Sequence, residues 1–428
     1  MSKPTLSDVI SCLSDYDPDA LPVAQAQQII RNTIQPIDSV ETVALHSALG
    51  RVLATDIISP INVPSHDNSA LDGYAFRAAD MHAGSPLTLK ILGTTYAGCA
   101  YQGTVREGEC ARIMTGGIMP PGCDTVIAQE AMRDATETSV VVPADAVKPG
   151  DNRRLAGEDL CAGKPALAKG KILRPAELGL IASLGIGEIT VQRRLRVAFF
   201  STGNELRSIG QPLDEGCVYD SNRYTLFGML TKLGCELIDM GIVKDDSAAL
   251  EAAFRHACEN ADAIITSGGV SVGAADYTKQ MMAQLGDVAF WKIGMRPGRP
   301  MAFGMITSNG KSAYLFGLPG NPVAVMVTFY FFARQALLHM MGAGAAPLPL
   351  VSVKSQSAIR KKPGRTEYQR GILSRDDGGQ LQVRITGSQG SGILRSMSEA
   401  NCMLVLRHDQ GSVSAGECVD VLLFEGLI

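Results

Sequence analysis

The sequence is poor in aromatic residues and has little excess charge of either sign. Phe, Trp and Tyr make up 5% of its 428 residues, and 43 acidic side chains nearly balance 39 basic ones, for a formal net charge of -4 at pH 7. A chain with so small a net charge has no general attraction to nucleic acid or to a membrane surface. Any anionic ligand must therefore meet local clusters of basic residues.

Metal-site and targeting patterns are also missing. The ten cysteines include no CxxC pair, and neither they nor the six histidines have the spacing of a metal site, which predicts reduced, buried thiols. No basic segment followed by an apolar core opens the chain, so we expect no secretory signal. The longest apolar run, Val323 to Ala333, stops at Arg334 and is too short to span a bilayer. We therefore expect a soluble, cytoplasmic protein.

The length and pattern of the sequence divide the chain into three parts. Single cores rarely grow beyond about 250 to 300 residues, so this chain requires several domains. We expect an N-terminal region at 1–190, interrupted at about 60–148 by a β-rich domain with alternating Gly, Thr and Val. An α/β domain at 191–341 and a small C-terminal β-barrel at 350–428 follow, separated by the linker GAGAAPLP.

Apolar spacing predicts helices in the N-terminal region. Apolar residues recur at helical intervals from Leu21 to Ile34. The segment from Pro175 to Gly185 begins with proline and ends with glycine, the usual asymmetry of a helix. The segment from Leu45 to Ile58 predicts a further helix that runs into a strand, with Gly50 as its C-cap.

Strands and helices alternate from Arg196 onward, which predicts an open, largely parallel sheet. Ligands of such sheets bind at the carboxyl ends of the strands. At one of these ends the sequence SGGVSVG provides glycines that permit positive φ and serines that donate hydrogen bonds, which favours an oxyanion. These residues are Ser267, Gly268, Gly269, Ser271 and Gly273. The alternative is a tight connection without a ligand, because the turn matches neither GxxxxGK[ST] nor GxGxxG.

Three carboxylates follow the ends of predicted strands, namely Glu205, Asp245 and Asp276. Each alone is explained as a cap or a surface charge. Converging on one edge beside an anion-binding turn, they favour a site where Mg²⁺ assists phosphate chemistry, with Lys279 close to the phosphate. The helix that enters through Asp220, Ser221 and Asn222 begins with good N-cap residue types.

Basic residues reach the same edge from a proline-stiffened turn, which suits a polyanion. They are Lys292, Arg296 and Arg299. The stiff turn Leu318-Pro319-Gly320-Asn321-Pro322 then opens a helix, in which Pro322 suits the first turn and Asn321 can cap. The free N–H groups of that helix form a second potential anion site.

Other glycine-rich segments allow two interpretations. The loop SPINVPSHDNSALDGYAFR is a connector in which Asp67, Asn68 and Asp72 cap their own backbone, or part of a site. Thr115 in RIMTGG either faces a ligand or closes its turn. The C-terminal domain adds basic and hydroxyl groups that are solvated or suit a second ligand head group. They are Lys361, Lys362, Arg365, Arg370, Ser388 and Ser391.

Taken together, the motifs resemble the molybdopterin molybdenumtransferase family, which includes the bacterial MoeA proteins and the C-terminal domain of gephyrin. The matching stretches occur in family order over nearly the whole chain: DNSALDGYA, RIMTG, GEDL, FSTGNEL, YDSN, TSGGVSVGAADYTK, RPGRPMAFG, GLPGNPV, GRTEYQRG and GSQGSG. The resemblance implies an elongated homodimer of four-domain subunits with an active site shared between subunits. It also implies Mg²⁺-dependent insertion of molybdate into adenylylated molybdopterin, with release of AMP.

The resemblance also assigns site residues, position by position. Catalytic roles are implied for Asp67, Thr115, Glu205, Asp245, Asp276, Lys292 and Arg296, and metal binding for Glu205, Asp245 and Asp276. The resemblance implies substrate binding for Asp159, Pro319, Pro322, Arg370 and Ser391. From their chemistry and position we also expect it for Asp220, Ser267, Gly268, Gly269, Ser271, Gly273, Lys279, Arg299, Gly320 and Asn321. Arg296 and Arg299 stand where relatives often have lysine, and a planar fork binds oxyanions differently from a point charge.

Three rival interpretations remain open. The upstream molybdopterin adenylyltransferase shares a similar α/β domain, but it predicts a short, single-domain chain; a contact with that enzyme is also expected. A receptor-clustering scaffold such as gephyrin needs an extra domain and a long linker. A catalytically dead binder would not need all the carboxylates. We expect no nucleic acid or membrane partner.

Overall fold

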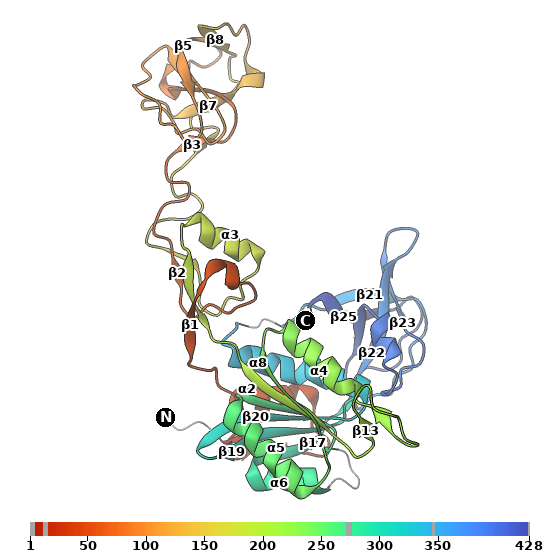
Figure 1. Ribbon diagram of the computed structural model, residues 1–428. Coiled ribbons are helices and arrows are strands. Elements are labelled where there is room, and N and C mark those ends of the chain that lie inside the picture. The colour runs from red at the N-terminus through yellow and green to blue at the C-terminus, as the bar shows by residue number, and fades with distance from the viewer. Residues whose placement is uncertain (1–4, 12–15, 271–275, 345–346, 427–428) are drawn as a thin grey trace.

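A computed structural model describes residues 5–11, 16–270, 276–344 and 347–426. The chain is elongated (Figure 1). A narrow N-terminal arm carries a small β domain far from an α/β domain, and the C-terminal domain packs beside the α/β domain. This arrangement confirms the predicted multidomain fold class.

The stem of the arm is built from short, mutually paired elements. Strand β1 (Val40–Ala44) pairs antiparallel with β11 (Glu188–Gln192), and α3 (Pro175–Ser183) packs beside them with proline at its first turn. The predicted helix at the beginning of the chain is present as α2 (Val23–Thr33), which packs in the core of the α/β domain and not in the stem.

The helix predicted from Leu45 to Ile58 is wrong. The structure has only the 3-10 turn η1 (Leu45–Ser47) and the short strand β2 (Ile57–Ile58). Between them the Gly50 and Leu53 amides donate to carbonyls of the segment that precedes α3, and Leu53 packs in the core of the stem. Pairing with a distant segment thus prevails over the local apolar spacing.

The distal domain is a curled five-stranded sheet with strand order β7-β4-β6-β5-β8. Its core holds Phe76, Leu89, Ile127 and Val140, all buried. The strands are β4 (Gly73–Phe76), β5 (Leu87–Thr95), β6 (Glu109–Ile113), β7 (Thr125–Ala128) and β8 (Ser139–Val142). The segments by which the chain enters and leaves this domain pair antiparallel with each other, as the short strands β3 (Asn68–Ser69) and β9 (Arg153–Arg154).

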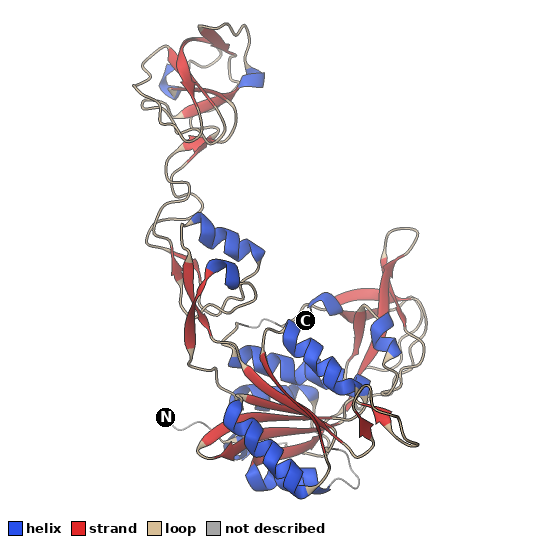
Figure 2. Cartoon of the chain, in the orientation of Figure 1, coloured by secondary structure: helices blue, strands red, loops and turns tan. Residues whose placement is uncertain are grey.

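The α/β domain is organised around a six-stranded sheet of order β15-β12-β16-β20-β19-β17. The first four strands in this order are parallel, β19 runs antiparallel to β20, and β17 runs antiparallel to β19. They are β15 (Glu236–Val243), β12 (Arg196–Thr202), β16 (Ala263–Ser267), β20 (Lys311–Leu318), β19 (Pro300–Ser308) and β17 (Gly286–Lys292). Helices cover both faces (Figure 2), which explains the continuous apolar runs of β12 and β16.

Each face has its own helices. Helix α5 (Ser247–Asn260) and α6 (Asp276–Leu285) lie on one face, and α4 (Ser221–Lys232) lies on the other.

One long apolar helix crosses the second face. It consists of α7 (Pro322–Thr328), a π-helical turn η4 (Phe329–Ala333) and α8 (Arg334–Met340). The prediction that this segment is too short to span a bilayer is wrong, because the helix continues for two turns beyond the start of α8 at Arg334 and is, by length and composition, long and apolar enough to cross a membrane. However, 72% of its most apolar window is buried inside the protein, which is the behaviour of a core helix.

The C-terminal domain is a closed five-stranded barrel, as predicted. Its order is β22-β23-β21-β25-β24, closed by the pairing of β24 with β22. The strands are β21 (Val351–Ser355), β22 (Thr366–Arg375), β23 (Leu381–Ile385), β24 (Cys402–Leu406) and β25 (Cys418–Leu423). A strand of the preceding domain, β18 (Met295–Arg296), adds to β22 in parallel register and so joins the two domains.

Candidate functional site

A cleft of about 790 Å³ lies where the carboxyl ends of the parallel strands face the barrel. It brings together many of the residues predicted from the sequence, although these come from segments far apart in the chain. They are Glu205, Asp220, Arg296, Arg299, Pro319, Gly320, Asn321, Pro322 and Ser391. The cleft therefore brings together Glu205 at a strand end, the turn with Arg296 and Arg299, the 319–322 turn, and the barrel loop with Ser391.

One wall of the cleft is the start of helix α4. Asp220 caps this helix: its Oδ1 accepts hydrogen bonds from the Ser201 hydroxyl at 2.9 Å and from the Arg223 amide at 3.2 Å. Asp220 is only 3% exposed. Asn222 follows two residues later. Its Nδ2 donates to the Ser267 hydroxyl at 2.8 Å and to the Gly320 carbonyl at 2.7 Å.

Another part of the cleft lining is a cationic wall of three arginines. Arg296, the last residue of β18, and Arg299, in the turn between β18 and β19, are exposed, and Arg365 comes from the barrel. The Arg365 Nε donates to the buried Glu367 carboxylate at 2.8 Å, which fixes the position of its guanidinium. Gly298 lets this turn pack against α7, because an added Cβ would lie 2.6 Å from a Thr328 methyl group. Guanidinium groups held in this way suit an oxyanion.

The glycine-rich turn has the predicted backbone. Gly268 has φ +95° and Gly269 has φ +70°, values that L side chains rarely adopt. An added Cβ at Gly268 would lie 2.5 Å from the Thr202 carbonyl oxygen, and Ser267 before it is buried. Ser271 and Gly273 lie outside the described residues.

Lys279, beyond this turn, is not among the residues of the cleft. Its ammonium lies 6.0 Å from the centroid of the Phe290 ring. The structure therefore gives no support to a contact between Lys279 and a ligand in the cleft.

The predicted metal ligands are only partly described. Glu205 is exposed and lines the cleft. Asp245 is half-buried and accepts a hydrogen bond from the Thr278 hydroxyl at 3.2 Å, while its own amide lies 3.4 Å from the Asn204 side-chain oxygen. The Asp276 side chain lies outside the described part, and the described residues contain no group of three potential metal ligands. The all-oxygen donors Glu205 and Asp245, at the ends of neighbouring strands, are of the type that Mg²⁺ prefers.

Two predicted anion-binding groups are already used by the protein. The Arg370 guanidinium is completely buried and donates to Ser396 Oγ at 2.9 Å and the Gly390 carbonyl at 2.9 Å, with longer contacts to the Ser388 and Gln389 carbonyls. Burial lowers the pKa of Arg370 to about 10, which leaves it charged at neutral pH. In this structure Arg370 holds the loop that carries Ser391 and does not line the cleft, so its direct contact with substrate stays a prediction.

The start of helix α7 is the second group. Asn321 occupies the N-cap position but makes no capping hydrogen bond through its side chain, contrary to the prediction. The Val323 amide donates to the Ser391 carbonyl of the barrel at 3.0 Å. One of the helix's free N–H groups is thus used to attach the barrel loop, and is not available to a ligand.

Lys292 also differs from the prediction. Its ammonium lies 2.6 Å from the Asp19 carboxylate of the N-terminal segment, and the residue does not line the cleft. The hydrogen bond from Lys292 lowers the pKa of Asp19. Backbone hydrogen bonds of the same N-terminal segment to residues 292 and 294 explain why Lys292 is held at this edge of the sheet.

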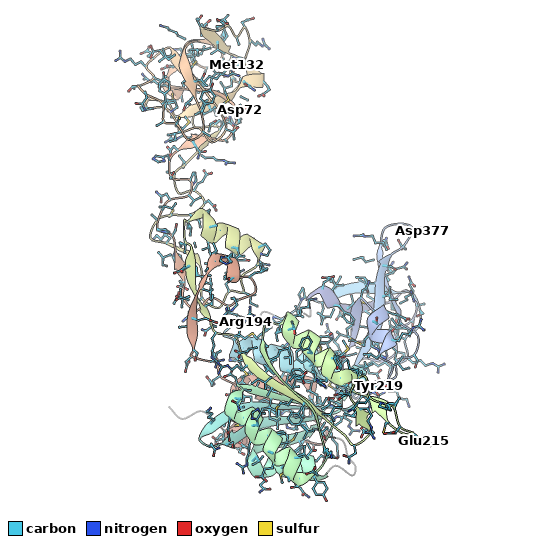
Figure 3. All side chains as sticks on the ribbon, in the orientation of Figure 1. Asp72, Met132, Arg194, Glu215, Tyr219 and Asp377 are labelled. Atoms are coloured by element: carbon cyan, nitrogen blue, oxygen red, sulfur yellow. The ribbon has the colours of Figure 1, made fainter. Side chains whose placement is uncertain are left out.

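Three predicted residues lie in the arm and distal domain. Asp67 accepts hydrogen bonds from the Ala156 amide and the Arg153 guanidinium, and these bonds lower its pKa. Thr115 donates through its amide and its hydroxyl to Asp72, both at 2.7 Å. Asp72 and Tyr219, a residue of the cleft, lie far apart in Figure 3. One chain therefore does not bring the Asp67 and Thr115 loops, or Asp159 near them, to its own cleft.

The sequence predicts no ligand contact for two residues of the cleft, Asn222 and Gln389, and leaves Arg365 either solvated or part of a second head-group site. Residue type predicts Asn222 only as an N-cap, although its amide connects the 319–322 turn of the cleft to the end of β16. Arg365 stands in a basic loop, and the pairing of β18 with β22 places the residue that follows it beside Met295. A residue that acts through a distant backbone carbonyl gives no local signal in a sequence.

Comparisons with known proteins agree with this architecture. Residues 21–185 match the MoeA N-terminal region (domain I and II), 198–339 a probable molybdopterin binding domain, and 352–424 the MoeA C-terminal region (domain IV). The chain is 42% identical over 389 residues to the molybdopterin molybdenumtransferase of Haemophilus influenzae, covering 91% of this chain and 95% of that protein. It is 38% identical to that of Nostoc sp., covering 94% and 93%.

A solved structure is similar over almost the full length. The molybdopterin biosynthesis MoeA protein of Pyrococcus horikoshii superposes with a TM-score of 0.80 at 29% identity, covering 95% of this chain and 100% of that one. The identity, the order of the matched regions and the shared architecture lead to one conclusion. The chain belongs to the molybdopterin molybdenumtransferase (MoeA) family.

Proposed function

We propose that the cleft is the active site of a molybdopterin molybdenumtransferase, a transferase of molybdenum cofactor biosynthesis. In this reaction molybdate is inserted into adenylylated molybdopterin, AMP is released, and Mg²⁺ is required. The observation that carries the proposal is that three arginines and the turns at the strand ends line a single cleft. A pyrophosphate-bearing substrate and a tetrahedral dianion require several cationic groups close together.

The residues of the chain then have distinct roles. Arg296, Arg299 and Arg365 neutralise the two anions and hold them near each other. The backbone of Gly268 and Gly269 supports the edge of the site, and the 319–322 turn shapes its floor. Glu205 and Asp245, with Asp276, would hold Mg²⁺, which when bound supplies charge neutralisation for the departing phosphate. Positioning and electrostatics, without a covalent protein intermediate, supply most of the rate.

A homodimer with a shared site explains the arm. Asp67, Thr115 and Asp159 are not among the residues of the cleft, and Asp72, the partner of Thr115, lies far from Tyr219 of the cleft (Figure 3), so a role for them at the reaction centre requires a second copy. Apolar side chains on the loop after Leu206 and on helix α4, next to segments that line the cleft, are exposed, which supports an interface there. They are Ile209, Leu213, Tyr224 and Phe227, with exposed fractions of 61%, 49%, 43% and 49%.

We propose a cytoplasmic location for the enzyme. A contact with the adenylyltransferase that supplies the substrate would limit loss of the adenylylated pterin.

The test measures AMP release and molybdenum incorporation from adenylylated molybdopterin, molybdate and Mg²⁺. Glu205→Gln should slow AMP release at saturating substrate and raise the Mg²⁺ concentration required. Glu215→Gln, on the exposed loop beside the cleft (Figure 3), is the matched control and should behave as wild type. Wild-type rates for Glu205→Gln at all Mg²⁺ concentrations would contradict the metal assignment. A wild-type protein that releases no AMP would contradict the proposed function.

Subunit mixing tests the shared site. Asp67→Asn and Glu205→Gln proteins are prepared separately and then exchanged. If each site combines Asp67 of one copy with Glu205 of the other, a mixed dimer contains one intact site and the mixture regains activity. A mixture no more active than its components would show that the arm does not serve the partner's cleft.

A further inference from the structure

Asn222 occupies an unusual place in the cleft wall. It is the second residue of α4, it lines the cleft, and it is 8% exposed. Both hydrogen bonds of its amide nitrogen go to other segments. One reaches the hydroxyl of Ser267, the last residue of β16, and the other reaches the carbonyl of Gly320 in the proline-stiffened turn.

The two turns that Asn222 bonds are also in contact with each other. Ser267 pairs with Leu318 in the parallel register of β16 and β20, and the Gly268 amide donates to the Leu318 carbonyl at 3.1 Å. A Cβ added at Gly320 would lie 3.7 Å from the Gly268 Cα, so the turns pack backbone against backbone. The 319–322 turn, which lines the cleft, therefore rests on the glycine-rich turn behind it, and the start of α4 is hydrogen-bonded to both.

The direction of these hydrogen bonds identifies the group that is needed. A carbonyl oxygen only accepts, so the atom facing Gly320 must be a donor, which fixes the orientation of the Asn222 amide. The two protons of a single NH₂ group serve the two loops. An aspartate has nearly the same shape but no such donor when ionised, and an alanine leaves the Gly320 carbonyl without this bond.

We infer that Asn222 is a positioning residue of the transfer reaction, and that its amide sets the spacing between the glycine-rich turn and the 319–322 turn on which the substrate rests. This inference rests on the proposed function for the identity of the reaction. Asn222 acts through the backbone of the two turns. Its removal should therefore lower kcat more than it raises KM, because a small displacement of a preorganised site costs rate, on the order of tenfold to a hundredfold.

The first experiment compares N222A and N222D with wild type. N222A should lower kcat at least about tenfold. KM for molybdate should change little, because the proposed function assigns molybdate binding to the arginines of the cationic wall. N222D should show a distinctive pH dependence. The ionised acid faces an acceptor, and burial raises its pKa, so lowering the pH restores a donor and the activity ratio of N222D to wild type should increase. Asn260, whose exposed amide donates to the His256 carbonyl, provides the control N260D, with a flat ratio.

A second measurement does not depend on turnover. Amide hydrogen exchange in N222A should increase at 263–270 and at 314–322 together, and remain unchanged in β11, while the melting temperature shows that the protein is folded. A double-mutant cycle of N222A with S267A should be non-additive in kcat, since one mutation already breaks their shared bond.

The outcomes are separable. Wild-type kcat in N222A, or a pH-independent N222D ratio together with unchanged exchange, would overturn the role of Asn222. A wild-type protein inactive toward adenylylated molybdopterin would instead contradict the proposed function, while the exchange measurement would still decide whether Asn222 holds the two turns.

Discussion

Replacing the buried Arg370 should loosen the barrel loop that reaches the cleft. Its guanidinium makes two short hydrogen bonds at 2.9 Å, to Ser396 Oγ and to the Gly390 carbonyl, and two longer ones to neighbouring carbonyls. Hydrogen bonds to charged groups contribute about 1.5–3 kcal/mol each. The two short ones, partly offset by relief from burying a charge, give a net loss of about 3 kcal/mol for Arg370→Met.

This loss should appear first in the barrel. A loss of about 3 kcal/mol corresponds to roughly a hundredfold larger population of open barrel, because each 1.4 kcal/mol is a factor of ten. Hydrogen exchange of β22 and β24 amides should accelerate by a similar factor. Because the barrel loop contacts α7 through the Ser391 carbonyl, kcat should also fall. Arg370→Lys keeps the charge but not the planar fork, and should lie between wild type and Arg370→Met.

The assay that refutes this reasoning is simple. If Arg370→Met left exchange and thermal stability unchanged but raised KM for molybdate, the guanidinium would act on the ligand directly. Arg395→Met, at a position where the side chain is 87% exposed, is the matched control and should change neither property.

Three further predictions follow from single sites. Gly268→Ala should destabilise the protein by about 1–3 kcal/mol and reduce activity, because its φ is +95° and the new methyl group meets a backbone carbonyl; thermal melts and AMP release measure this. A hydrogen bond from Arg174 lowers the pKa of Glu177 to about 2, so its contribution to stability is complete above about pH 4.5 and is lost as the pH falls toward 2. Glu177→Gln should therefore flatten the melting temperature over that range. Arg299→Gln should raise KM for molybdate several-fold with a smaller effect at high salt, measured by initial rates at two ionic strengths.

Each of these predictions has a control and a contrary result. Gly187→Ala adds a methyl group where no atom lies within 4 Å and should have little effect. Equal losses at Gly187 and Gly268 would show that the strained turn is not the cause. An acid transition identical in wild type and Glu177→Gln would contradict the assignment of that carboxylate. A KM that is unchanged by Arg299→Gln would remove this arginine from the cationic wall.

The general architecture could be predicted because its signals are local. Alternating strands and helices after Arg196, and glycines where φ is positive, follow directly from residue type. The failure at Leu45–Ile58 has the opposite cause, because that segment bonds to a partner more than a hundred residues away.

The site was predictable in part for the same reason. The strand-end residue Glu205, the N-cap residue Asp220 and Arg296 of the basic turn line the cleft, whereas the strand-end residue Asp245 does not. Lys292 and Arg370 did not, because each found a partner inside the protein, on Asp19 and on the carbonyls of a barrel loop. A sequence shows that a residue is basic, but it does not show which carboxylate or carbonyl group in the folded chain will accept its hydrogen bonds. The carboxylate set around Asp276 stays a prediction.

The pairing of β18 with β22 has a consequence for how this chain can be divided. Arg296 belongs by sequence to the α/β domain, yet its backbone is a strand of the barrel's sheet. A fragment ending at the 345–349 linker would retain every strand of the six-stranded sheet and still lose the support of its basic wall. The boundary between the domains in sequence, at the linker, therefore differs from their boundary in the structure, where β18 belongs to the barrel's sheet. Exchange of barrels between relatives should accordingly succeed only when the β18 segment is exchanged with them.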